Sequence, residues 1–315
     1  MWWKKENLVA LAPMSDLTDT PFSRICRLVA DADFVIFKEM VSAEAIIRES
    51  KKTLQRADFL EEERPVIIQI FGGEPQAMVG AAQQIVAQQK PEGIDINMGC
   101  PVPKIAGKAQ AGASLLRDPQ RAIQIVSALK KADLGVTISV KTRLGWSDPK
   151  EIIDFAPQLE QAGADLLTIH GRTKSAGYTG QADWSAIAAA VSRVKIPVLA
   201  NGDITSLATM RECLDQTGAT GVMVGRAVLG NPWLLRELVQ GKNQLPTLAE
   251  IKDIVFQHAQ YHLDYYGQNF GLASFRRHLL FYFSGFPGIK KVRSGLAKTN
   301  TLADLKAVLS TIRES

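Results

Sequence analysis

The sequence predicts a (β/α)8 barrel followed by a small C-terminal helical bundle. Eight short apolar runs, rich in Val, Ile and Leu, recur over the first 244 residues. Each run is too continuous for a half-exposed antiparallel strand, which indicates parallel strands buried on both faces. Stretches with helical spacing separate the runs, and such alternation is typical of βα units. After residue 244 the strand-like runs stop, and apolar residues continue at helical spacing.

The elements follow one another in a regular order. The predicted strands are residues 8–11, 34–37, 66–71, 94–96, 136–140, 166–169, 197–200 and 221–224. The clearest helical stretches between and after them are residues 77–89, 119–131, 149–162, 183–191, 206–216 and 232–238. Asp118-Pro119 is typical of a helix start, with a capping side chain followed by proline. We therefore expect a barrel domain over residues 1–244 and a helical domain over residues 245–315.

A doubly wound sheet is the rival architecture. That fold carries a glycine-rich phosphate-binding turn after its first strand. In this sequence the first strand runs into Ala12-Pro13-Met14-Ser15, which is no such turn. The pattern therefore favours the barrel.

Composition restricts the class of protein. The chain has 315 residues, of which 46% are hydrophobic and 22% charged, as in ordinary globular proteins. Three cysteines without a C-x-x-C pair do not suggest a disulfide framework or a zinc finger, and favour a reducing cytoplasm. No apolar run reaches the ~20 residues that span a bilayer. The first residues, Met-Trp-Trp-Lys-Lys-Glu, lack the order of a signal peptide.

The positive charge is concentrated near the C-terminus. The chain carries a net charge of +5, and residues 245–315 hold nine Lys/Arg against five Asp/Glu. A basic helical segment beside a near-neutral barrel indicates a polyanionic partner for that segment. A solvated surface that is merely basic is the alternative.

Polar residues follow nearly every predicted strand. In (β/α)8 barrels the active site lies at the carboxyl ends of the strands. The residues at those positions are Pro13-Met14, Lys38-Glu39, Gln69, Asn97 with Cys100, Lys141 with Arg143, His170 with Arg172, Asn201-Gly202-Asp203 and Gly225-Arg226. We expect them to form a shared site.

The last two of these turns suit a phosphate group. They follow the seventh and eighth strands, where barrels often bind phosphate through glycine amides and a helix N-terminus. Lys141 follows apolar and hydroxylated residues, so it either forms an ion pair or faces a ligand. Gln69 and Asn201 can each donate to and accept from the edge of a planar ring. The set suits a flavin mononucleotide, and equally other phosphorylated ligands.

Cys100 and His170 each have a structural alternative. Cys100 lies between Gly99 and Pro101 on a turn, which favours chemistry over packing as a small buried hydrophobe. A thiol with an ordinary pKa of about 8.5 stays protonated at neutral pH and can act as a general acid. His170 ends a strand, and the alternative is a core histidine bonded to a carbonyl. The remaining histidines lie in the helical segment without a carboxylate at ligand spacing, so no catalytic metal is predicted.

Taken together, these motifs resemble the tRNA-dihydrouridine synthases, and the bacterial B-type branch most closely. The resemblance covers the barrel in family order and the helical segment more loosely. The matching motifs are Ala12-Pro13-Met14, Asp19-Thr20-Pro21-Phe22, Gln69-Ile70-Phe71-Gly72, Asp95-Ile96-Asn97-Met98-Gly99-Cys100-Pro101, Lys141-Thr142-Arg143-Leu144-Gly145-Trp146, Ile169-His170-Gly171-Arg172-Thr173, Asn201-Gly202-Asp203-Ile204 and Gly225-Arg226-Ala227.

The resemblance implies an FMN-dependent, NADPH-driven reduction of particular uridines in tRNA to 5,6-dihydrouridine. It implies that a hydride passes from reduced flavin to C6 of uracil and that Cys100 gives a proton to C5. The residues that it implies around the flavin are Pro13, Met14, Ser15, Gln69, Lys141 and His170, with Asn201, Gly202, Asp203, Gly225 and Arg226 at its phosphate.

The resemblance also implies contacts with tRNA. Asn97 and Arg143 are expected at the uracil edge, and Arg172 and Lys104 are further substrate candidates. Candidates for phosphate contacts in the helical segment are Arg276, Arg277, Lys290, Lys291, Arg293 and Lys298. A monomer without a membrane or protein partner is expected. Two rivals stay open: a flavin barrel acting on a free pyrimidine, and a non-catalytic tRNA-binding flavoprotein.

Overall fold

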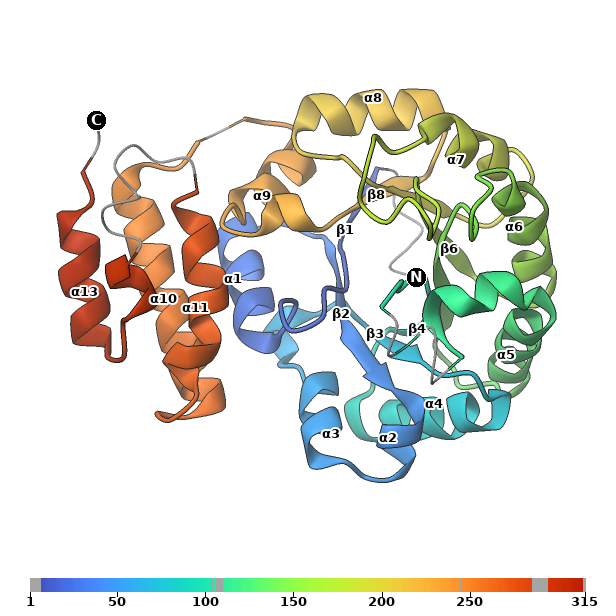
Figure 1. The fold of residues 1–315 in the computed structure, drawn as a ribbon, viewed down its shortest axis with the longest axis horizontal. Helices are drawn as coiled ribbons and strands as arrows, with labels where there is room; N and C mark the ends of the chain where they lie inside the picture. The colour runs from blue at the N-terminus through green and yellow to red at the C-terminus, as the bar shows by residue number, and fades with distance from the viewer. Residues whose placement is uncertain (1–6, 103–104, 106–109, 244, 285–293, 314–315) are drawn as a thin grey trace. The chain divides into compact units, whose positions relative to one another are not determined.

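The computed structural model of the chain contains a closed barrel of eight parallel strands in sequence order, which confirms the predicted fold (Figure 1). The structure describes residues 7–102, 105, 110–243, 245–284 and 294–313. The strands are β1 (Leu8–Leu11), β2 (Val35–Ser42), β3 (Val66–Phe71), β4 (Gly93–Met98), β5 (Thr137–Arg143), β6 (Leu166–His170), β7 (Val198–Asn201) and β8 (Gly221–Val224). The pairing of β1 with β8 closes the barrel.

Helices follow the strands, as the alternating pattern predicts. Those between β1 and β8 are α1 (Thr20–Ala30), α2 (Ala43–Ile47), α3 (Lys51–Ala57), α4 (Pro75–Gln89), α5 (Pro119–Lys131), α6 (Glu151–Gln161), α7 (Trp184–Val191) and α8 (Leu207–Thr217), with short 3-10 turns η1 (Glu61–Glu63) and η3 (Gly112–Arg117). After β8 come η4 (Arg226–Val228), α9 (Trp233–Gln240), α10 (Leu248–Tyr266), α11 (Gly271–Tyr282) and α13 (Leu302–Thr311). Asp118 caps α5 by accepting from the amide of Arg121.

The chain forms two compact units. The first consists of residues 1–15 and 34–224, and contains the barrel with α2 to α8. The second consists of residues 16–33 and 225–315, and contains α1 with the helices that follow β8. The first helix of the chain therefore belongs to the second unit. The functional boundary between residues 244 and 245 stays a prediction.

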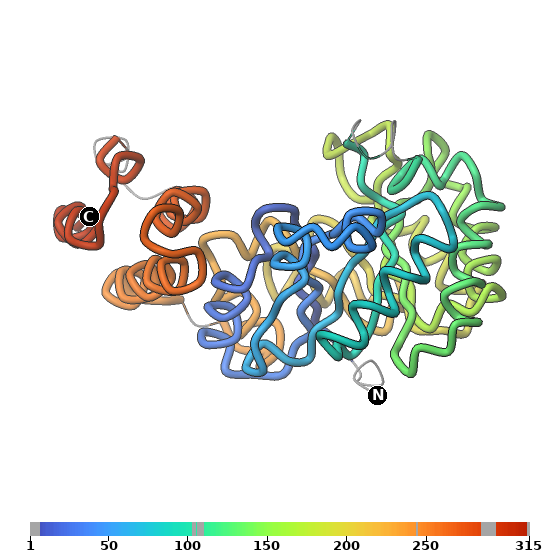
Figure 2. Tube along the Cα trace, turned by 90° about the horizontal axis from the view of Figure 1, so that it is seen from below, coloured from blue at the N-terminus to red at the C-terminus, as the bar shows by residue number. Residues whose placement is uncertain are grey.

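The second unit is built around its own apolar core. Ile25 and Val29 of α1 pack in one cluster with Trp233 of α9 and with side chains of α10, α11 and α13. These last three helices lie side by side (Figures 1 and 2). The described part of this unit is helical, in agreement with the predicted bundle. No helix among the described residues is long and apolar enough to cross a membrane.

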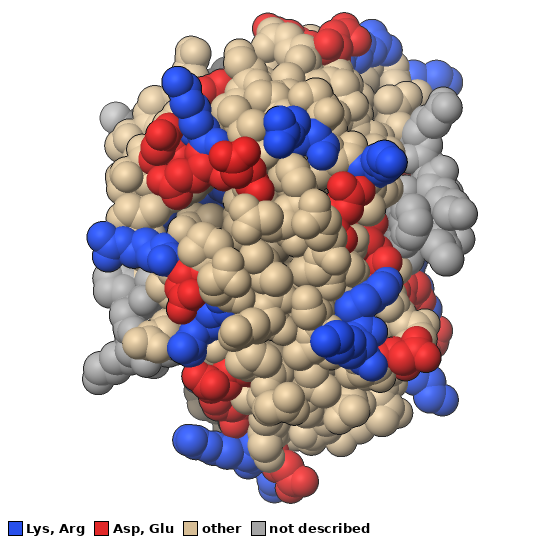
Figure 3. Space-filling view, turned by 90° about the vertical axis from the view of Figure 1, so that its right-hand side faces the viewer, with Lys and Arg blue, Asp and Glu red and all other residues tan. Residues whose placement is uncertain are grey.

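The outer helices of the barrel unit have a mixed surface. On the face that lies to the right in Figure 1, where α5, α6 and α7 are found, Lys and Arg are interspersed with Asp and Glu (Figure 3). A surface with both signs intermixed is typical of a solvated exterior and offers little attraction to a polyanion.

Several predicted strand ends fall short of the observed ones, and the end of the second strand differs most. The sequence pattern ends the second strand at residue 37, but β2 continues to Ser42 across a register shift between Lys38 and Val41. Lys38 pairs in register with Ile68, and its ammonium lies 2.9 Å from Glu63, with both side chains fully buried. Lys38 therefore forms a buried ion pair instead of ending a strand at the shared site.

This ion pair gives a stability prediction. Glu63→Ala should lower the free energy of unfolding by about 3 kcal/mol, because it removes the carboxylate that compensates a buried ammonium. Urea denaturation monitored by circular dichroism measures the change. The matched control is Glu74→Ala, which removes an exposed carboxylate 2.8 Å from Arg121 and should cost less than about 1 kcal/mol. Equal losses in the two variants would show that the Lys38–Glu63 pair adds no special stability.

Candidate active site

The inner face of the barrel changes from apolar to polar along the strands. Side chains from six strands, among them Ile67, Leu166 and Leu199, form one buried cluster that only the barrel interior can hold. Successive side chains of a strand alternate between faces, so residues two positions further along point the same way. This places Gln69 and Asn201, each two residues beyond a member of the cluster, on the interior face. The polar layer thus lies at the carboxyl ends of the strands, as predicted.

Asp95 is the centre of this polar layer. It lies on β4 and is fully buried. Its carboxylate accepts hydrogen bonds from Gln69 Nε2 at 2.6 Å and Ser139 Oγ at 2.6 Å. Burial raises the pKa of Asp95 from 3.8 to about 6, although these hydrogen bonds and the charge of Lys141 act in the opposite direction. The strand-end pattern does not predict Asp95 as a site residue; its one signal is a charged residue inside an apolar strand.

A directed chain of hydrogen bonds runs from Asp95 to Cys100. Gln69 donates to Asp95 and accepts from Asn97 Nδ2 at 2.7 Å. Asn97 in turn accepts from the amides of Gly99 at 3.2 Å and Cys100 at 2.9 Å. Because an ionised carboxylate can only accept, it fixes the orientation of both amide side chains. The turn that carries the thiol is therefore held by side chains of β3 and β4.

Cys100 is half-buried and carries a free thiol. Burial raises the pKa of its thiol, and the nearby cations Arg143 and Lys141 only partly offset the effect. The carbonyl of Cys100 accepts from the amide of Ala113 at 3.0 Å, which closes the following loop against the turn. Gly112 fits there because its φ is +60° and a Cβ would lie 3.0 Å from that carbonyl oxygen. A protonated, positioned thiol at a strand end suits a general acid.

Lys141 provides a cation in the same layer. Its ammonium donates to Asn201 Oδ1 at 3.1 Å, and Asn201 is oriented by donating to the carbonyl of Met223 at 2.8 Å. Burial first, and then the charge of Arg143, lower the pKa of Lys141 to about 8, while Asp95 acts in the opposite direction. Lys141 is therefore mostly charged at neutral pH, and Asn201 takes one of its three N–H donors.

Arg143 is buried and supports the surrounding loops. Its guanidinium donates to the carbonyls of Gly99 at 2.8 Å, Thr173 at 3.1 Å and Gly177 at 2.8 Å, and lies 5.4 Å from the ring centre of Tyr178. These bonds tie the Cys100 turn to the loop after β6. Its predicted contact with a substrate stays a prediction.

Arg172 connects the ends of β6 and β7. It is buried and binds both carboxylate oxygens of Asp203, at 2.7 and 2.9 Å. Its Nη1 also lies 3.4 Å from Nε2 of His170. Because a guanidinium can only donate, Nε2 of His170 acts as the acceptor in this contact. Asp203 also accepts from the amide of Ala182 at 2.7 Å, so Arg172 and Asp203 hold together the loops that follow β6 and β7. The predicted substrate role of Arg172 stays a prediction.

Gly202, directly after β7, packs closely against Ala182 and His170. Its φ is +120°, and a Cβ would lie 2.9 Å from Cβ of Ala182 and 3.1 Å from Cδ2 of His170. Only glycine fits such a backbone and such a close approach.

The remaining predicted residues of the barrel follow β1 or β8, and several others lie outside the described part of the chain. Pro13 and Met14 follow β1 half-buried, and Ser15 is exposed. Gly225 and Arg226 belong to the second unit, so their predicted phosphate contact stays a prediction. Predicted residues outside the described part of the chain are Lys104, Lys290, Lys291 and Arg293.

Three of the residues predicted for phosphate contacts are described, and they differ in exposure: Lys298 is exposed, and the two described arginines differ from each other. Arg276 is half-buried and donates to the carbonyl of Thr299 at 3.0 Å and to the side chain of Asn300. Arg277 is exposed and lies 3.6 Å from the carboxylate of Asp16. Arg277 is thus the more accessible of the two. Their contacts with tRNA remain predictions.

Comparison with known proteins identifies clear relatives. A family model described as "Dihydrouridine synthase (Dus)" matches residues 10–315. A relative named "Probable tRNA-dihydrouridine synthase 1" from Synechocystis sp. is 41% identical over 308 residues, covering 96% of this chain and 85% of the relative. "tRNA-dihydrouridine synthase B" from Pseudomonas aeruginosa is 37% identical over 315 residues, covering 98% and 92% of the two chains.

Solved structures share the fold at low sequence identity. A structure of a morphinone reductase N189A mutant in complex with tetrahydroNAD has a TM-score of 0.56 at 12% identity, over 78% of this chain and 90% of that chain. The crystal structure of TcOYE with pHBA has a TM-score of 0.54 at 9% identity, over 78% and 92%. These matches support the barrel architecture alone.

The raised pKa of Asp95 gives a pH prediction. Between pH 3.8 and about 6 the folded protein binds a proton at Asp95 that the unfolded chain releases. The stability that the protonated form of Asp95 contributes is therefore fully present below pH 3.8 and is lost as the pH rises to about 6. The free energy of unfolding of the wild type, relative to Asp95→Asn, should fall across this window by up to about 1.4 kcal/mol per pH unit. Denaturation of both proteins at several pH values measures this difference, and a constant difference would contradict the assignment.

Proposed function

Because the chain belongs to the dihydrouridine synthase family, we propose that it reduces specific uridines of tRNA to 5,6-dihydrouridine, with bound FMN as cofactor and NADPH as reductant. The observation that carries the proposal is the oriented chain from Asp95 through Gln69 and Asn97 to a protonated Cys100, beside the cation of Lys141. A positioned acid and a half-buried cation suit the reduction of a uracil ring by a flavin.

The residues of the polar layer fit a flavin ring and its phosphate. Lys141 and Asn201 offer a cation and an amide, and Gln69 offers a further amide on the same interior face. Thr168 is a buried residue of β6 beside Lys141 in register, and its hydroxyl lacks a hydrogen-bond partner among the described residues. Gly202 allows a close backbone approach at the end of β7. We assign the ring to the first group and the phosphate end to residues 201–203.

Reduced FMN would supply a hydride, which carries both electrons of the reduction, to C6 of uracil. The protein's own residues supply the rest. Cys100 holds a proton on its thiol because burial raises its pKa, and gives that proton to C5. The positive charge of Lys141 stabilises negative charge on the ring system bound beside it. Asn97 positions Cys100 by accepting from its amide.

The substrate base must leave the tRNA stack to reach this layer. Extruding one base costs about a few kcal/mol in lost stacking and pairing, which contacts with the tRNA phosphates offset. We assign these contacts to the basic second unit, with exposed Arg277 as the first candidate. With tRNA as substrate, the cytoplasm is the proposed compartment and a monomer the proposed state.

An anaerobic experiment tests the proposal as a whole. The purified protein is reduced with NADPH, and tRNA that lacks dihydrouridine is then added while flavin absorbance is followed. Rapid reoxidation with formation of dihydrouridine supports the proposal. Reoxidation by free uracil or orotate but not by tRNA would replace it with a small-pyrimidine reductase. A protein that takes up no FMN would refute the cofactor assignment.

Replacing the thiol tests the role of Cys100. Cys100→Ala should leave flavin reduction by NADPH unchanged and slow reoxidation by tRNA by about 10²–10⁴-fold, the usual contribution of a general acid. Stopped-flow absorbance separates the two half-reactions. Cys213→Ala is the matched control, since it removes a buried thiol of α8. A wild-type rate of reoxidation in Cys100→Ala would refute the proton-donor role.

Salt dependence tests the role of the second unit. With about four phosphate contacts, tRNA affinity should fall about a hundredfold between ~50 and ~200 mM salt, because bound counterions are released. Arg277→Gln should reduce the slope of log affinity against log salt by about one contact. Filter binding measures both. Lys195→Gln, at an exposed lysine of the barrel unit, is the control and should leave the slope unchanged. A slope insensitive to Arg277→Gln removes that residue from the interface.

A further inference from the structure

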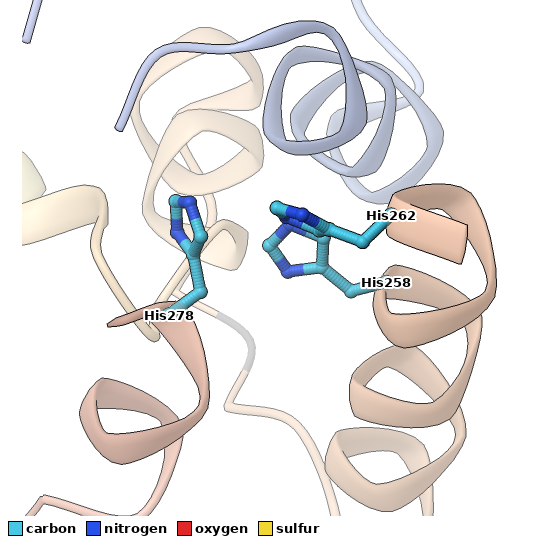
Figure 4. A group of neighbouring side chains, drawn as sticks. All are labelled: His258, His262 and His278. Carbon is cyan, nitrogen blue, oxygen red and sulfur yellow. The ribbon is translucent and has the colours of Figure 1, made fainter. Parts of the chain in front are cut away.

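Three histidines of the second unit form a buried cluster. His258 and His262 lie four residues apart on α10, so they share one face of the helix, and His278 faces them from α11 (Figure 4). One ring nitrogen of each lies within 4.8 Å of the others. Their exposed fractions are 0%, 0% and 1%. The proposed reaction uses none of them.

The hydrogen bonds around the rings leave nitrogens without partners. Nδ1 of His262 lies 2.7 Å from Oγ of Ser274, which donates its own proton to the carbonyl of Gly271 at 2.8 Å. His262 must therefore donate from Nδ1 and carry a lone pair on Nε2. Nδ1 of His258 lies 3.0 Å from the hydroxyl of Tyr282, an arrangement that also leaves Nε2 for another partner.

These remaining nitrogens are both buried and unsatisfied. Nε2 of His258, Nε2 of His262 and both ring nitrogens of His278 have no hydrogen-bond partner among the described residues. Leaving one buried polar atom without a partner typically costs about 1–3 kcal/mol. Three imidazoles converge here with buried ring nitrogens that lack hydrogen-bond partners among the described residues. This arrangement points to a ligand that accepts several lone pairs at once.

The protonation state of the cluster suits a metal. Burial lowers the pKa of His262 to about 3 and that of His278 to about 4, and holds the pKa of His258 well below its usual value. Neutral imidazole is the ligating form, so no proton competes at neutral pH. The carboxylate of Asp19 lies 3.9 Å from Nε2 of His262 and supplies negative charge, while Arg277 opposes it.

We propose that His258, His262 and His278 bind one divalent transition metal ion, with zinc as the best fit and Asp19 as the neighbouring counter-charge. Three imidazoles with one further position are a common zinc donor set, and each Zn–N bond is about 2.0–2.1 Å long. The ligand nitrogens, which lie within 4.8 Å of one another, would move closer together to reach this bond length. Tyr282 and Ser274 then serve as the outer partners that orient ligating histidines.

The ion would join three helices of the second unit. His258 and His262 belong to α10, His278 to α11, and Asp19 caps α1 by accepting from the amide of Phe22 at 3.0 Å. Phe22 also stacks on His278, with ring centres 4.9 Å apart. Metal binding contributes to folding stability when the unfolded chain has no site, so the ion stabilises the unit.

The test uses the full-length protein without a histidine tag. After treatment with a chelator and dialysis, the protein is titrated with Co²⁺ and followed by visible absorption, and the untreated protein is assayed for metals by mass spectrometry. We expect one equivalent of zinc or cobalt per chain, ligand-field bands without a thiolate charge-transfer band, and displacement of Co²⁺ by Zn²⁺. A wild-type protein that takes up no Co²⁺ overturns the proposal and identifies the cluster as a neutral aromatic core.

Variants locate the site. His278→Gln should abolish stoichiometric Co²⁺ binding, and Tyr282→Phe should weaken it by about 10–100-fold by removing an outer partner. His170→Gln changes the histidine of the barrel unit and should leave Co²⁺ binding unchanged. Circular dichroism verifies that each variant is folded, and loss of protection by Zn²⁺ in thermal melts gives a second readout. Full Co²⁺ binding by folded His278→Gln overturns the assignment.

Discussion

The candidate active site depends on one buried carboxylate. Asp95 is fully buried, so the surrounding side chains must donate to its carboxylate, and Gln69 and Ser139 do so. The oxygen and the nitrogen of an amide side chain can exchange places by rotation. The orientation is settled when a partner that only accepts hydrogen bonds fixes the position of the nitrogen. Asp95 is that partner. Gln69 then turns its oxygen to Asn97, and Asn97 turns its oxygen to the amide of Cys100. The position of the thiol is therefore a consequence of a charge on β4, the strand that precedes it, and the amide side chains of Gln69 and Asn97 transmit this effect.

The sequence predicts the barrel well because burial on both faces leaves a strong pattern. Continuous apolar runs require parallel strands, and their closure in sequence order follows from the regular alternation with helices. The pattern fails where a local irregularity replaces alternation. β2 continues past Lys38 through a register shift, and Lys38 forms an ion pair with Glu63, although a lysine after an apolar run is typical of a strand end. The sequence pattern also fails where one polar residue binds another. It cannot show that Arg172 binds Asp203, because the first lies on the loop after β6 and the second on the loop after β7.

The second unit illustrates a different limit. Its helices are predicted by spacing, but the membership of α1 is a tertiary property: Ile25 and Val29 find their apolar partners on helices that follow β8. The histidine cluster is of the same kind. Two of its members lie four residues apart on α10, which periodicity detects, but the third comes from α11, and only the packing of the two helices brings its ring within reach. A spacing rule that requires ligands close in sequence cannot find such a site.

The balance of burial and charge around Cys100 decides what chemistry its thiol can perform. Two cations, Lys141 and Arg143, lie near enough to lower its pKa, and in many enzymes such neighbours create a thiolate nucleophile. In this site burial has the larger effect, and the pKa is raised. Part of the reason is geometric: Lys141 is directed to Asn201, and Arg143 is held by three main-chain carbonyls, so neither forms an ion pair with the sulfur. A thiol that stays protonated beside fixed cations is unsuited to nucleophilic attack and suited to giving up one proton to a carbon that has just become electron-rich.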